Sequence, residues 1–266
     1  MIEMKNLSAF IECSTGSTPT VATLKKHIDL LELFGYDRLW LGVTDAYKIP
    51  SEPYFNYNRG GYTKEQFQEI DAYAEGKGIE LCLNFQTLAH LAYIIRYDDY
   101  HPIMDTEDIL MVGEEKTYEL IDKMFASLSE SVKSRTIHIG MDEALNLGLG
   151  NYLKKNGYRE KKDILLEHLN RVCEIAQKYN YSCEIWADMF FRLAKGSDFD
   201  ESGVIPDEIK GLVPEGVRLV HWAYGKQPDE RLRDRLKTVK AITGSASLAG
   251  CAWKSMGLAP NNVYSI

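Results

Sequence analysis

Short apolar runs alternate with longer amphipathic stretches along most of this chain. Runs of this kind are typical of buried strands. Seven of them occur, at 9–13, 38–43, 79–85, 136–139, 182–186, 218–222 and 247–253. Between them, four stretches place apolar residues on one face of a predicted helix, at 23–34, 64–76, 115–128 and 162–179.

Strands and helices follow one another at intervals of roughly 30 to 50 residues, which is typical of βα units around a parallel sheet. A closed (β/α)₈ barrel needs an eighth strand, but the sequence stops at Ile266, shortly after the seventh. We therefore expect an α/β fold, a TIM-type barrel with seven strands visible and the eighth missing, in a single incomplete catalytic domain over 1–266. Because an open sheet edge invites pairing with another chain, a homo-oligomer is also expected.

Composition and charge narrow the class of protein. The chain has 266 residues, 45% of them hydrophobic, with a net charge of -8. No basic patch with interleaved aromatic residues stands out, so we expect no nucleic-acid partner. No apolar run approaches ~18 residues and no signal peptide opens the chain, so we expect no membrane span. The five scattered cysteines are typical of buried thiols in a cytoplasmic protein.

Two adjacent carboxylates, Asp142 and Glu143, carry the strongest chemical signal. They follow the strand-like run at 136–139 and a glycine. A strand that ends in two acids brings two charges to the mouth of a core, where burial is costly unless the charges are paired or used. The simpler interpretation is an acidic strand-to-loop junction that caps a helix.

The residues that follow the other strands favour the functional interpretation. In a parallel barrel the active site is built from the C-terminal strand ends and the loops after them. Three of the chain's 4 Trp residues fall there, interleaved with acids, and a Trp face suits the apolar face of a sugar ring. The alternative is that these Trp residues complete the core. Besides the two acids, the residues expected at this rim are Asp45, Tyr47, Gln86, His90, Trp186, Asp188, Trp222, Tyr224 and Trp253.

The segment from His138 to Glu143 (HIGMDE) resembles the His-x-Gly-Gly-Asp-Glu signature of glycoside hydrolase family 20, the β-N-acetylhexosaminidases, with Met141 in place of the second Gly. The resemblance is closer to a branch that includes streptococcal hexosaminidases and animal hexosaminidase D. It extends in order over nearly the whole chain. Its segments are 52–62, 86–91, 108–116, 140–144, 186–191 and 252–254.

The resemblance implies a glycosidase that removes terminal β-linked N-acetylhexosamine, with no cofactor and no metal. This family uses substrate-assisted retaining catalysis, in which the acetamide oxygen of the substrate attacks its own anomeric carbon. Glu143 is then the general acid and Asp142 polarises the acetamide. Tyr224 binds the acetamide carbonyl, Trp186 forms part of the wall, and Asp45 and His90 support the acid. Since the acid must hold a proton, we expect Glu143 to be buried beside Asp142.

The chain departs from the family pattern where relatives grip the hydroxyls of the sugar. Thr15 stands where an Arg is expected at the end of the first strand, and Thr44 and Ala223 replace acids. Ser255 replaces an aromatic residue. A lost charge-assisted contact costs about 1.5–3 kcal/mol. We therefore expect weak, roughly millimolar binding of a monosaccharide, mainly through its N-acetyl group.

Two other functions remain open at this point. One is a paralogue of altered specificity, or nearly inactive, that still binds an amino sugar. The other is a metal-dependent isomerase or lyase, for which His138, His221 and Asp188 are the candidate ligands. As core or supporting residues these three side chains would be less surprising.

Overall fold

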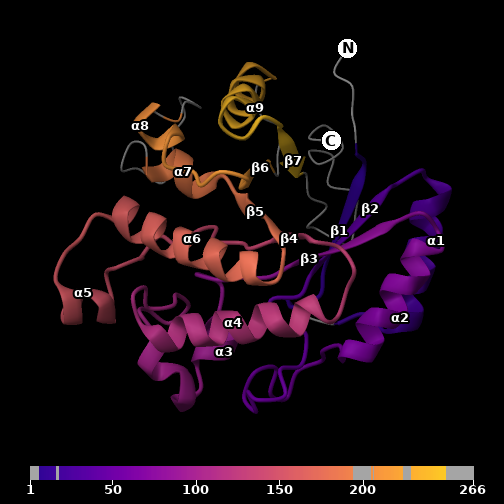
Figure 1. Ribbon diagram of the computed structural model, residues 1–266, viewed down its shortest axis with the longest axis horizontal. Coiled ribbons are helices and arrows are strands. Elements are labelled where there is room, and N and C mark those ends of the chain that lie inside the picture. The colour runs from indigo at the N-terminus through magenta and orange to yellow at the C-terminus, as the bar shows by residue number, and fades with distance from the viewer. Residues whose placement is uncertain (1–5, 16–17, 194–204, 206, 224–228, 250–266) are drawn as a thin grey trace.

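Seven parallel strands form one sheet in the order β1-β2-β3-β4-β5-β6-β7 (Figure 1). The computed structural model describes residues 6–15, 18–193, 205, 207–223 and 229–249. The strands are β1 (Ser8–Glu12), β2 (Arg38–Gly42), β3 (Glu80–Asn84), β4 (Thr136–His138), β5 (Ser182–Trp186), β6 (Arg218–Trp222) and β7 (Ser247–Ala249). Each strand lies within one residue of a predicted run, apart from the end of β7, where the predicted run continues past the described residues.

Each strand pairs in parallel with the next strand along the chain. This order, with a helical connection between successive strands, is the wall of a (β/α) barrel. The predicted fold class, a TIM-type α/β barrel with seven visible strands, is therefore confirmed. Residues 250–266 lie outside the described residues, so the missing eighth strand and the single-domain boundary stay predictions.

The four predicted helices correspond to α1 (Val21–Leu33), α2 (Lys64–Glu75), α4 (Glu115–Ser129) and α6 (Lys161–Lys178). Two of them begin at a threonine cap. Thr20 accepts a hydrogen bond from the Thr23 amide, and Thr63 forms a reciprocal capping box with Gln66. None of the helices in the described ranges is long and apolar enough to cross a lipid bilayer.

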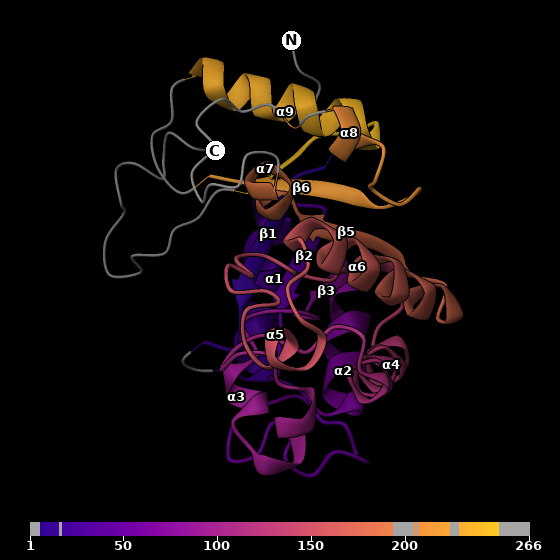
Figure 2. The same ribbon diagram turned by 90° about the vertical axis from the view of Figure 1, so that its left-hand side faces the viewer.

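Five α-helices and a 3₁₀ helix were not predicted from the sequence. They are α3 (Ala92–Ile95), the 3₁₀ helix η1 (Asp98–Ile103), α5 (Asn151–Asn156), α7 (Asp188–Leu193), α8 (Asp207–Lys210) and α9 (Asp229–Thr243). All but α9 are too short to show a helical period. They lie in the connections between strands, and α9 packs against β6 and β7 (Figures 1 and 2).

β1 and β7 are the edges of the described sheet, since β1 pairs there with β2 alone and β7 with β6 alone. On β1, Ser8, Phe10 and Glu12 are exposed, and Phe10 keeps 44% of its surface accessible. The Phe10 ring faces Trp186 of β5 at 6.4 Å between ring centroids, so these exposed residues belong to the inner face of the wall. The homo-oligomer expected from an open sheet edge stays a prediction.

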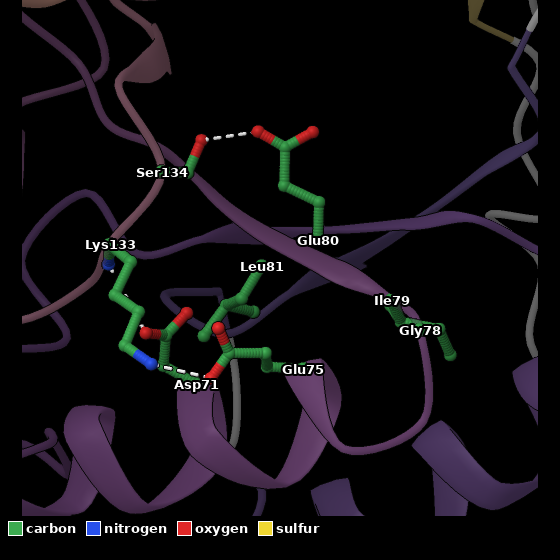
Figure 3. Close-up of a pocket in the computed structure, with 8 residues that line it drawn as sticks. All are labelled: Asp71, Glu75, Gly78, Ile79, Glu80, Leu81, Lys133 and Ser134. Carbon is green, nitrogen blue, oxygen red and sulfur yellow. Dashed lines mark hydrogen bonds and ion pairs between the residues drawn. The ribbon is translucent and has the colours of Figure 1, made fainter.

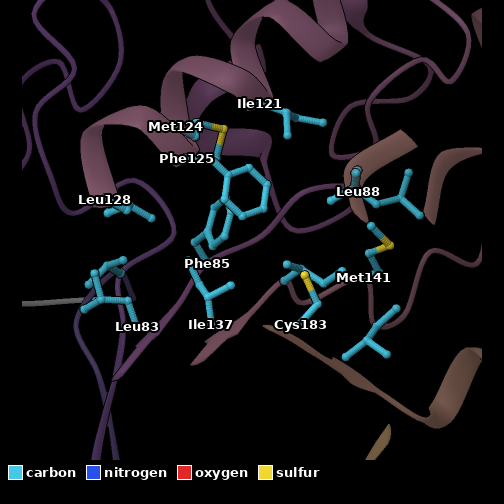
Figure 4. Packing of buried hydrophobic residues seen from close by; sticks show 14 of the residues in the cluster. Leu83, Phe85, Leu88, Ile121, Met124, Phe125, Leu128, Ile137, Met141 and Cys183 are labelled. Atoms are coloured by element: carbon cyan, nitrogen blue, oxygen red, sulfur yellow. The ribbon is translucent and has the colours of Figure 1, made fainter. Parts of the chain in front are cut away.

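Part of the hydrophobic core lies between the middle strands and helices α4 and α6 (Figure 4). Phe85, which directly follows β3, meets Phe125 of α4 edge to face, with ring centroids 5.0 Å apart. Leu83, Ile137 and Met124 are buried around them. This packing fixes the ends of β3 and β4, from which the candidate acids project.

Met141 joins this core and also adopts an unusual backbone conformation. Its side chain is fully buried, and Figure 4 shows it among the residues of the cluster. Its φ angle is +67°, in the left-handed region that costs a residue with a Cβ roughly 1–2 kcal/mol. The family signature has Gly here, which adopts this angle without that cost. Burial of the Met side chain offsets the strain.

We expect Met141→Gly to leave the protein more stable than Met141→Ala does. Both changes remove the buried thioether chain, at about 2–5 kcal/mol. Only Gly also relieves the strain of the positive φ, which is worth roughly 1 kcal/mol. Chemical denaturation of the two variants measures the difference.

Met124 is the matched control, because it is equally buried but lies within α4. There the order should reverse, with Met124→Gly less stable than Met124→Ala by about 1 kcal/mol. If the Gly variant were less stable than the Ala variant at position 141 as well, Met141 would carry no backbone strain.

Candidate functional site

The predicted site residues that the structure describes follow the C-terminal ends of β2 to β6. Asp45 follows β2, His90 follows β3, and Asp142 and Glu143 follow β4. Trp186 ends β5, Asp188 begins α7, and Trp222 ends β6. Tyr224 and Trp253 lie outside the described residues. The roles assigned to all of these residues remain predictions, and the contacts below describe their geometry.

Asp142 is held from two sides by residues that follow β3. Gln86 donates from Nε2 to Asp142 Oδ1 at 2.7 Å, and its own Oε1 accepts from the Met141 amide at 3.1 Å. His90 Nε2 lies 3.2 Å from the other carboxylate oxygen, Oδ2. Both oxygens of Asp142 are therefore engaged, and its side chain is only 18% exposed. The carboxylate has one fixed orientation.

These contacts set the charge of the pair. Burial alone would raise the pKa of Asp142, but the hydrogen bond and charge of His90, with the Gln86 hydrogen bond, outweigh burial and lower it. The same hydrogen bond to Asp142 raises the pKa of His90 to about 9, against the opposing effect of burial, and the charges of Glu143 and Asp108 add to the rise. At neutral pH the pair is an Asp carboxylate and a His cation.

Glu143 points toward solvent, beside this pair. Its side chain is 43% exposed, so the expectation that the acid is buried is wrong. The physical reason lies in the backbone, which turns at Glu143 with a φ of +51° just outside the strand. Glu143 Oε2 lies 3.7 Å from His90 Nε2, and Oε1 lies 4.0 Å from Arg192. The Glu143 carboxyl thus has cations on two sides.

Asp188 holds the same turn through a hydrogen bond to its backbone. Its Oδ2 accepts a hydrogen bond from the Glu143 amide at 3.0 Å and lies 3.4 Å from Arg192 Nε, one helical turn along α7. Burial and the charge of Asp142 raise the pKa of Asp188 to about 6, although hydrogen bonds from the Glu143 amide and Trp222 and the charge of Arg192 oppose the rise. These contacts are to protein groups. The sugar contact expected of Asp188 stays a prediction.

The floor beneath the acids is aromatic. The His138 ring lies 4.2 Å from the Trp186 ring and 6.2 Å from the Trp40 ring, measured between centroids. Its Nδ1 accepts from the Asn84 side chain at 2.8 Å and from the Gly140 amide at 3.1 Å, which leaves the proton on Nε2. Burial lowers the pKa of His138 to about 3, so this ring is neutral. Trp186 is buried and closes this floor.

Asp45 forms a second polar centre rather than a visible pair with His90. Its buried carboxylate lies 2.6 Å from Arg59 Nε. The Arg59 guanidinium also donates to the Ser14 carbonyl, next to Thr15, and lies 3.9 Å from the centroid of the Tyr93 ring. A guanidinium therefore reaches the end of β1 from the loop after β2, although position 15 is not Arg. Burial raises the pKa of Asp45, against the effect of Arg59.

The rim also concentrates backbone strain. Positive φ angles occur at Thr44 (+27°), His90 (+60°), Met141 (+67°) and Glu143 (+51°), each just past the end of β2, β3 or β4. Such angles cost of order 1–3 kcal/mol each and persist where the surroundings hold them. Their grouping at one edge is typical of a functional site.

Sequence reasoning missed two cations of this rim, Arg59 and Arg192. Arg59 lies in a segment quoted for the resemblance, but nothing in the spacing indicates that its side chain crosses to β1. Arg192 follows Asp188 by four residues, which on a helix brings the two side chains to one face. That spacing could have indicated the pair.

The ligand set of the metal-dependent alternative is not assembled. His221 packs against Phe191 of α7, and burial lowers its pKa to about 4, whereas His138 belongs to the floor. In the described part of the chain, the group whose ligand atoms lie within 4.8 Å of one another is His90, Asp142 and Glu143. Asp142 in this group is already bound by Gln86 and His90, and Glu143 lies beside His90 and Arg192.

A separate hollow lies at the opposite, N-terminal end of the strands (Figure 3). Its polar groups are occupied with one another. Lys133 contacts Asp71 through its amide and Glu75 through its ammonium, and Ser134 donates to Glu80 at 2.7 Å. The hollow lies between α2, the start of β3 and the residues just before β4. The polar side chains named here contact one another, so we assign it no ligand.

Known proteins resemble this chain in both sequence and fold. It is 26% identical to beta-hexosaminidase 3 of Arabidopsis thaliana over 194 residues, which are 70% of this chain and 34% of that protein. The GH20 β-N-acetylhexosaminidase of Streptomyces coelicolor A3(2) superposes with a TM-score of 0.66 at 20% identity, over 91% of this chain and 47% of that one.

A Streptomyces plicatus β-hexosaminidase, solved in complex with GlcNAc, superposes with a TM-score of 0.66 at 19% identity, again over 91% of this chain and 47% of that chain. At such identities the superpositions show a shared fold. The chain spans about half the length of these solved relatives and about a third of the plant protein.

The model of the catalytic domain of glycosyl hydrolase family 20 matches residues 19–227. The match covers more than half of the chain and runs through the strand ends that carry Asp45, His90, Asp142, Glu143 and Asp188. It confirms the resemblance that the segment from His138 to Glu143 carries. The chain therefore belongs to glycosyl hydrolase family 20.

Proposed function

We propose that this chain is the catalytic part of a glycoside hydrolase that removes terminal β-linked N-acetylhexosamine by substrate-assisted retaining catalysis. One observation carries the proposal, namely that Asp142 is held ionised and oriented by Gln86 and His90 directly beside the exposed Glu143. Family membership supports the same chemistry. The substrate is a carbohydrate with a terminal N-acetylhexosamine.

The two acids divide the work. The anionic Asp142 accepts the acetamide N–H of the substrate, which turns the acetamide oxygen toward the anomeric carbon and makes it more nucleophilic. Glu143 can reach a leaving oxygen from its exposed position and give it a proton. When water later opens the oxazolinium intermediate, the same residue takes a proton back. His90 contacts both acids and holds their relative orientation.

Two further groups of residues complete the site, the aromatic floor and the pair Asp188 and Arg192. The neutral rings of Trp186 and His138 pack against each other near the acids and add no competing charge, and Trp186 is proposed as part of the wall that the sugar meets. Asp188 and Arg192 fix the backbone and the carboxyl of Glu143 from the α7 side. Trp222, Tyr224 and Trp253 are proposed as further substrate contacts.

A second candidate is a paralogue that binds an amino sugar but turns it over slowly or prefers another sugar. It is favoured by Thr15, Thr44 and Ala223, which occupy positions where relatives place charged groups. Hydrolysis of a chromogenic N-acetylglucosaminide, measured beside titration with an N-acetylglucosamine-thiazoline inhibitor, separates the two. Inhibitor binding with no turnover supports the second candidate, whereas loss of turnover on adding a chelator would support metal-dependent chemistry.

We also propose that the protein works in a reducing compartment, the cytoplasm. The support is that Cys13, Cys82, Cys173 and Cys183 are free and buried. Cys251 lies outside the described residues.

Replacing each acid should affect substrates differently. Glu143→Gln removes the proton donor, so we expect a loss of about 10²–10⁴-fold in kcat/KM on substrates with poor leaving groups, and a much smaller loss on activated aryl glycosides. Asp142→Asn weakens the nucleophile itself, so both kinds of substrate should suffer, by on the order of 10²–10³-fold. Steady-state kinetics on the two substrate types checks this.

Glu119→Gln serves as the control, because Glu119 is exposed on α4 and the substitution makes the same change of charge. It should leave both rates unchanged. Small and equal effects of the two site substitutions would contradict the assigned roles.

The pH dependence should report the pair of His90 and Asp142. Asp142 must be ionised, and His90 lowers its pKa. His90→Asn therefore should move the acid limb of kcat/KM to higher pH, by roughly one unit. On activated aryl glycosides, which need little proton donation from Glu143, activity of the native protein should also fall as the pH rises through about 9, where His90 loses its proton, and the variant should lack this limb.

His101→Asn is the matched control, since His101 lies in η1 and contacts Asp98 rather than the acids. Its pH profile should match that of the native protein. An unchanged acid limb in His90→Asn would mean that His90 does not set the charge of Asp142.

A further inference from the structure

Tyrosine and arginine side chains gather on two neighbouring loops of the rim. We call them the Tyr–Arg patch. Its members from the loop between β2 and α2, and from α3 and the residues after it, are Tyr54, Tyr57, Arg59, Tyr93, Arg96 and Tyr97. Tyr54, Tyr57 and Tyr93 keep 38%, 47% and 44% of their surface exposed. Three large rings that remain this open beside a candidate active site call for an explanation.

Mutual contacts hold the patch in place. Tyr54 stacks on Tyr97 with centroids 5.4 Å apart and an interplanar angle of 28°. Tyr57 meets both rings edge-on, at 5.7 Å from Tyr54 and 5.9 Å from Tyr97. The Arg96 guanidinium lies 4.8 Å over Tyr97 and 5.8 Å over Tyr93, and donates to the Tyr97 hydroxyl at 2.7 Å. Rings fixed in this way lose little entropy when a ligand binds.

The patch begins at the acid site. Tyr93 lies in α3, three residues after His90, which contacts both Asp142 and Glu143. Arg59 lies over Tyr93 and joins it to Asp45 and to the end of β1. The patch therefore continues outward from the rim at which the terminal sugar is expected to bind.

A purely structural role does not explain the exposure. The same two loops are already anchored by buried aromatic residues. Phe55 packs against Tyr47 at 5.0 Å, and Tyr100 donates to Glu52 at 3.0 Å. Both Phe55 and Tyr100 are almost fully buried. A tie between the loops would bury the patch rings in the same way.

The chemistry of the patch matches a chain of sugar rings. A pyranose presents an apolar C–H face and a rim of hydroxyls, and tyrosine offers a flat apolar face beside a polar edge. Arginine supplies several donors in a fixed plane for hydroxyl and carbonyl oxygens. Tyr and Arg are also the residues enriched where proteins hold their ligands and partners tightly.

We propose that the Tyr–Arg patch is a second carbohydrate-contact site, which takes the sugars that follow the terminal one in a β-linked chain of N-acetylhexosamine. The proposal rests on the proposed function, because it places the terminal sugar at Asp142 and Glu143. It makes the preferred substrate an oligosaccharide. It also explains how a site without an Arg at position 15 gains affinity, since later sugars add contacts that a monosaccharide lacks.

Binding measured without turnover tests the proposal. Calorimetry on the full chain carrying Glu143→Gln compares N-acetylglucosamine with its β-1,4-linked trimer. The monosaccharide should bind in the roughly millimolar range, and the trimer at least about tenfold more tightly. Tyr57→Ala or Tyr93→Ala should each weaken trimer binding by roughly five- to tenfold and leave monosaccharide binding unchanged. Tyr57→Phe and Tyr93→Phe should retain most of the gain.

Tyr158→Ala is the matched control, because Tyr158 is 70% exposed but lies between α5 and α6. It should leave trimer binding unchanged. Melting temperatures of all variants separate binding from folding. If the Ala substitutions lower the melting temperature and the trimer keeps its full advantage, the patch only ties the loops and the proposal is overturned.

Titration with an N-acetylglucosamine-thiazoline separates failure of this proposal from failure of the proposed function. If the thiazoline binds and the trimer binds no more tightly than the monosaccharide, the patch is not a carbohydrate site and the proposed function stands. If the thiazoline and both sugars fail to bind, the proposed function fails and this proposal fails with it.

Discussion

The site depends on one interaction, the fixing of a largely buried carboxylate by a cation and an amide. Asp142 would be costly to keep ionised where it lies, since burial alone raises the pKa of such a group. His90 and Gln86 offset that cost, each by engaging a different carboxylate oxygen. Without them the acid would take up a proton or turn away, and the amide of a substrate would find no fixed acceptor.

Other features follow from that charge. Together with burial, the negative charge of Asp142 raises the pKa of Asp188 to about 6. Asp188, which accepts the hydrogen bond from the Glu143 amide, therefore changes charge close to neutral pH. The positive φ angles at His90, Met141 and Glu143 lie close together, just past the ends of β3 and β4. Strain of this kind persists only on a rigid support. The packing of Phe85 against Phe125 and the burial of Met141 supply that support at the ends of β3 and β4.

The sequence was informative where one residue type repeats with a period. Strands such as Arg38–Gly42 and helices such as Lys161–Lys178 are set by local apolar patterns, and these predictions were confirmed. The polar helix Asp229–Thr243 was missed because only a few of its residues, such as Val239, reach the core. The position of Asp142 and Glu143 at a strand end could also be predicted, because a carboxylate pair after an apolar run is a local signal.

Contacts between distant loops could not be predicted. Nothing in the spacing indicates that Arg59 contacts Asp45 and reaches the carbonyl of Ser14, since side-chain direction depends on the path of the whole loop. Glu143 likewise lies in a turn with several positive φ angles, at Gly140, Met141 and Glu143, which the neighbouring residues in the sequence do not specify. A resemblance to a family predicts which residues occupy the site. The directions and contacts of their side chains depend on the three-dimensional fold.

The protonation of His90 tests the central claim most directly. Imidazole resonances followed by NMR across a pH titration, with His90 assigned from His90→Asn, give its pKa in the intact chain. The account predicts a midpoint near about 9, which returns toward the ordinary value of about 6.5 in Asp142→Asn. A midpoint near 6.5 in the native chain, or one that Asp142→Asn leaves unchanged, would contradict the claim that these two residues hold each other in the charged state.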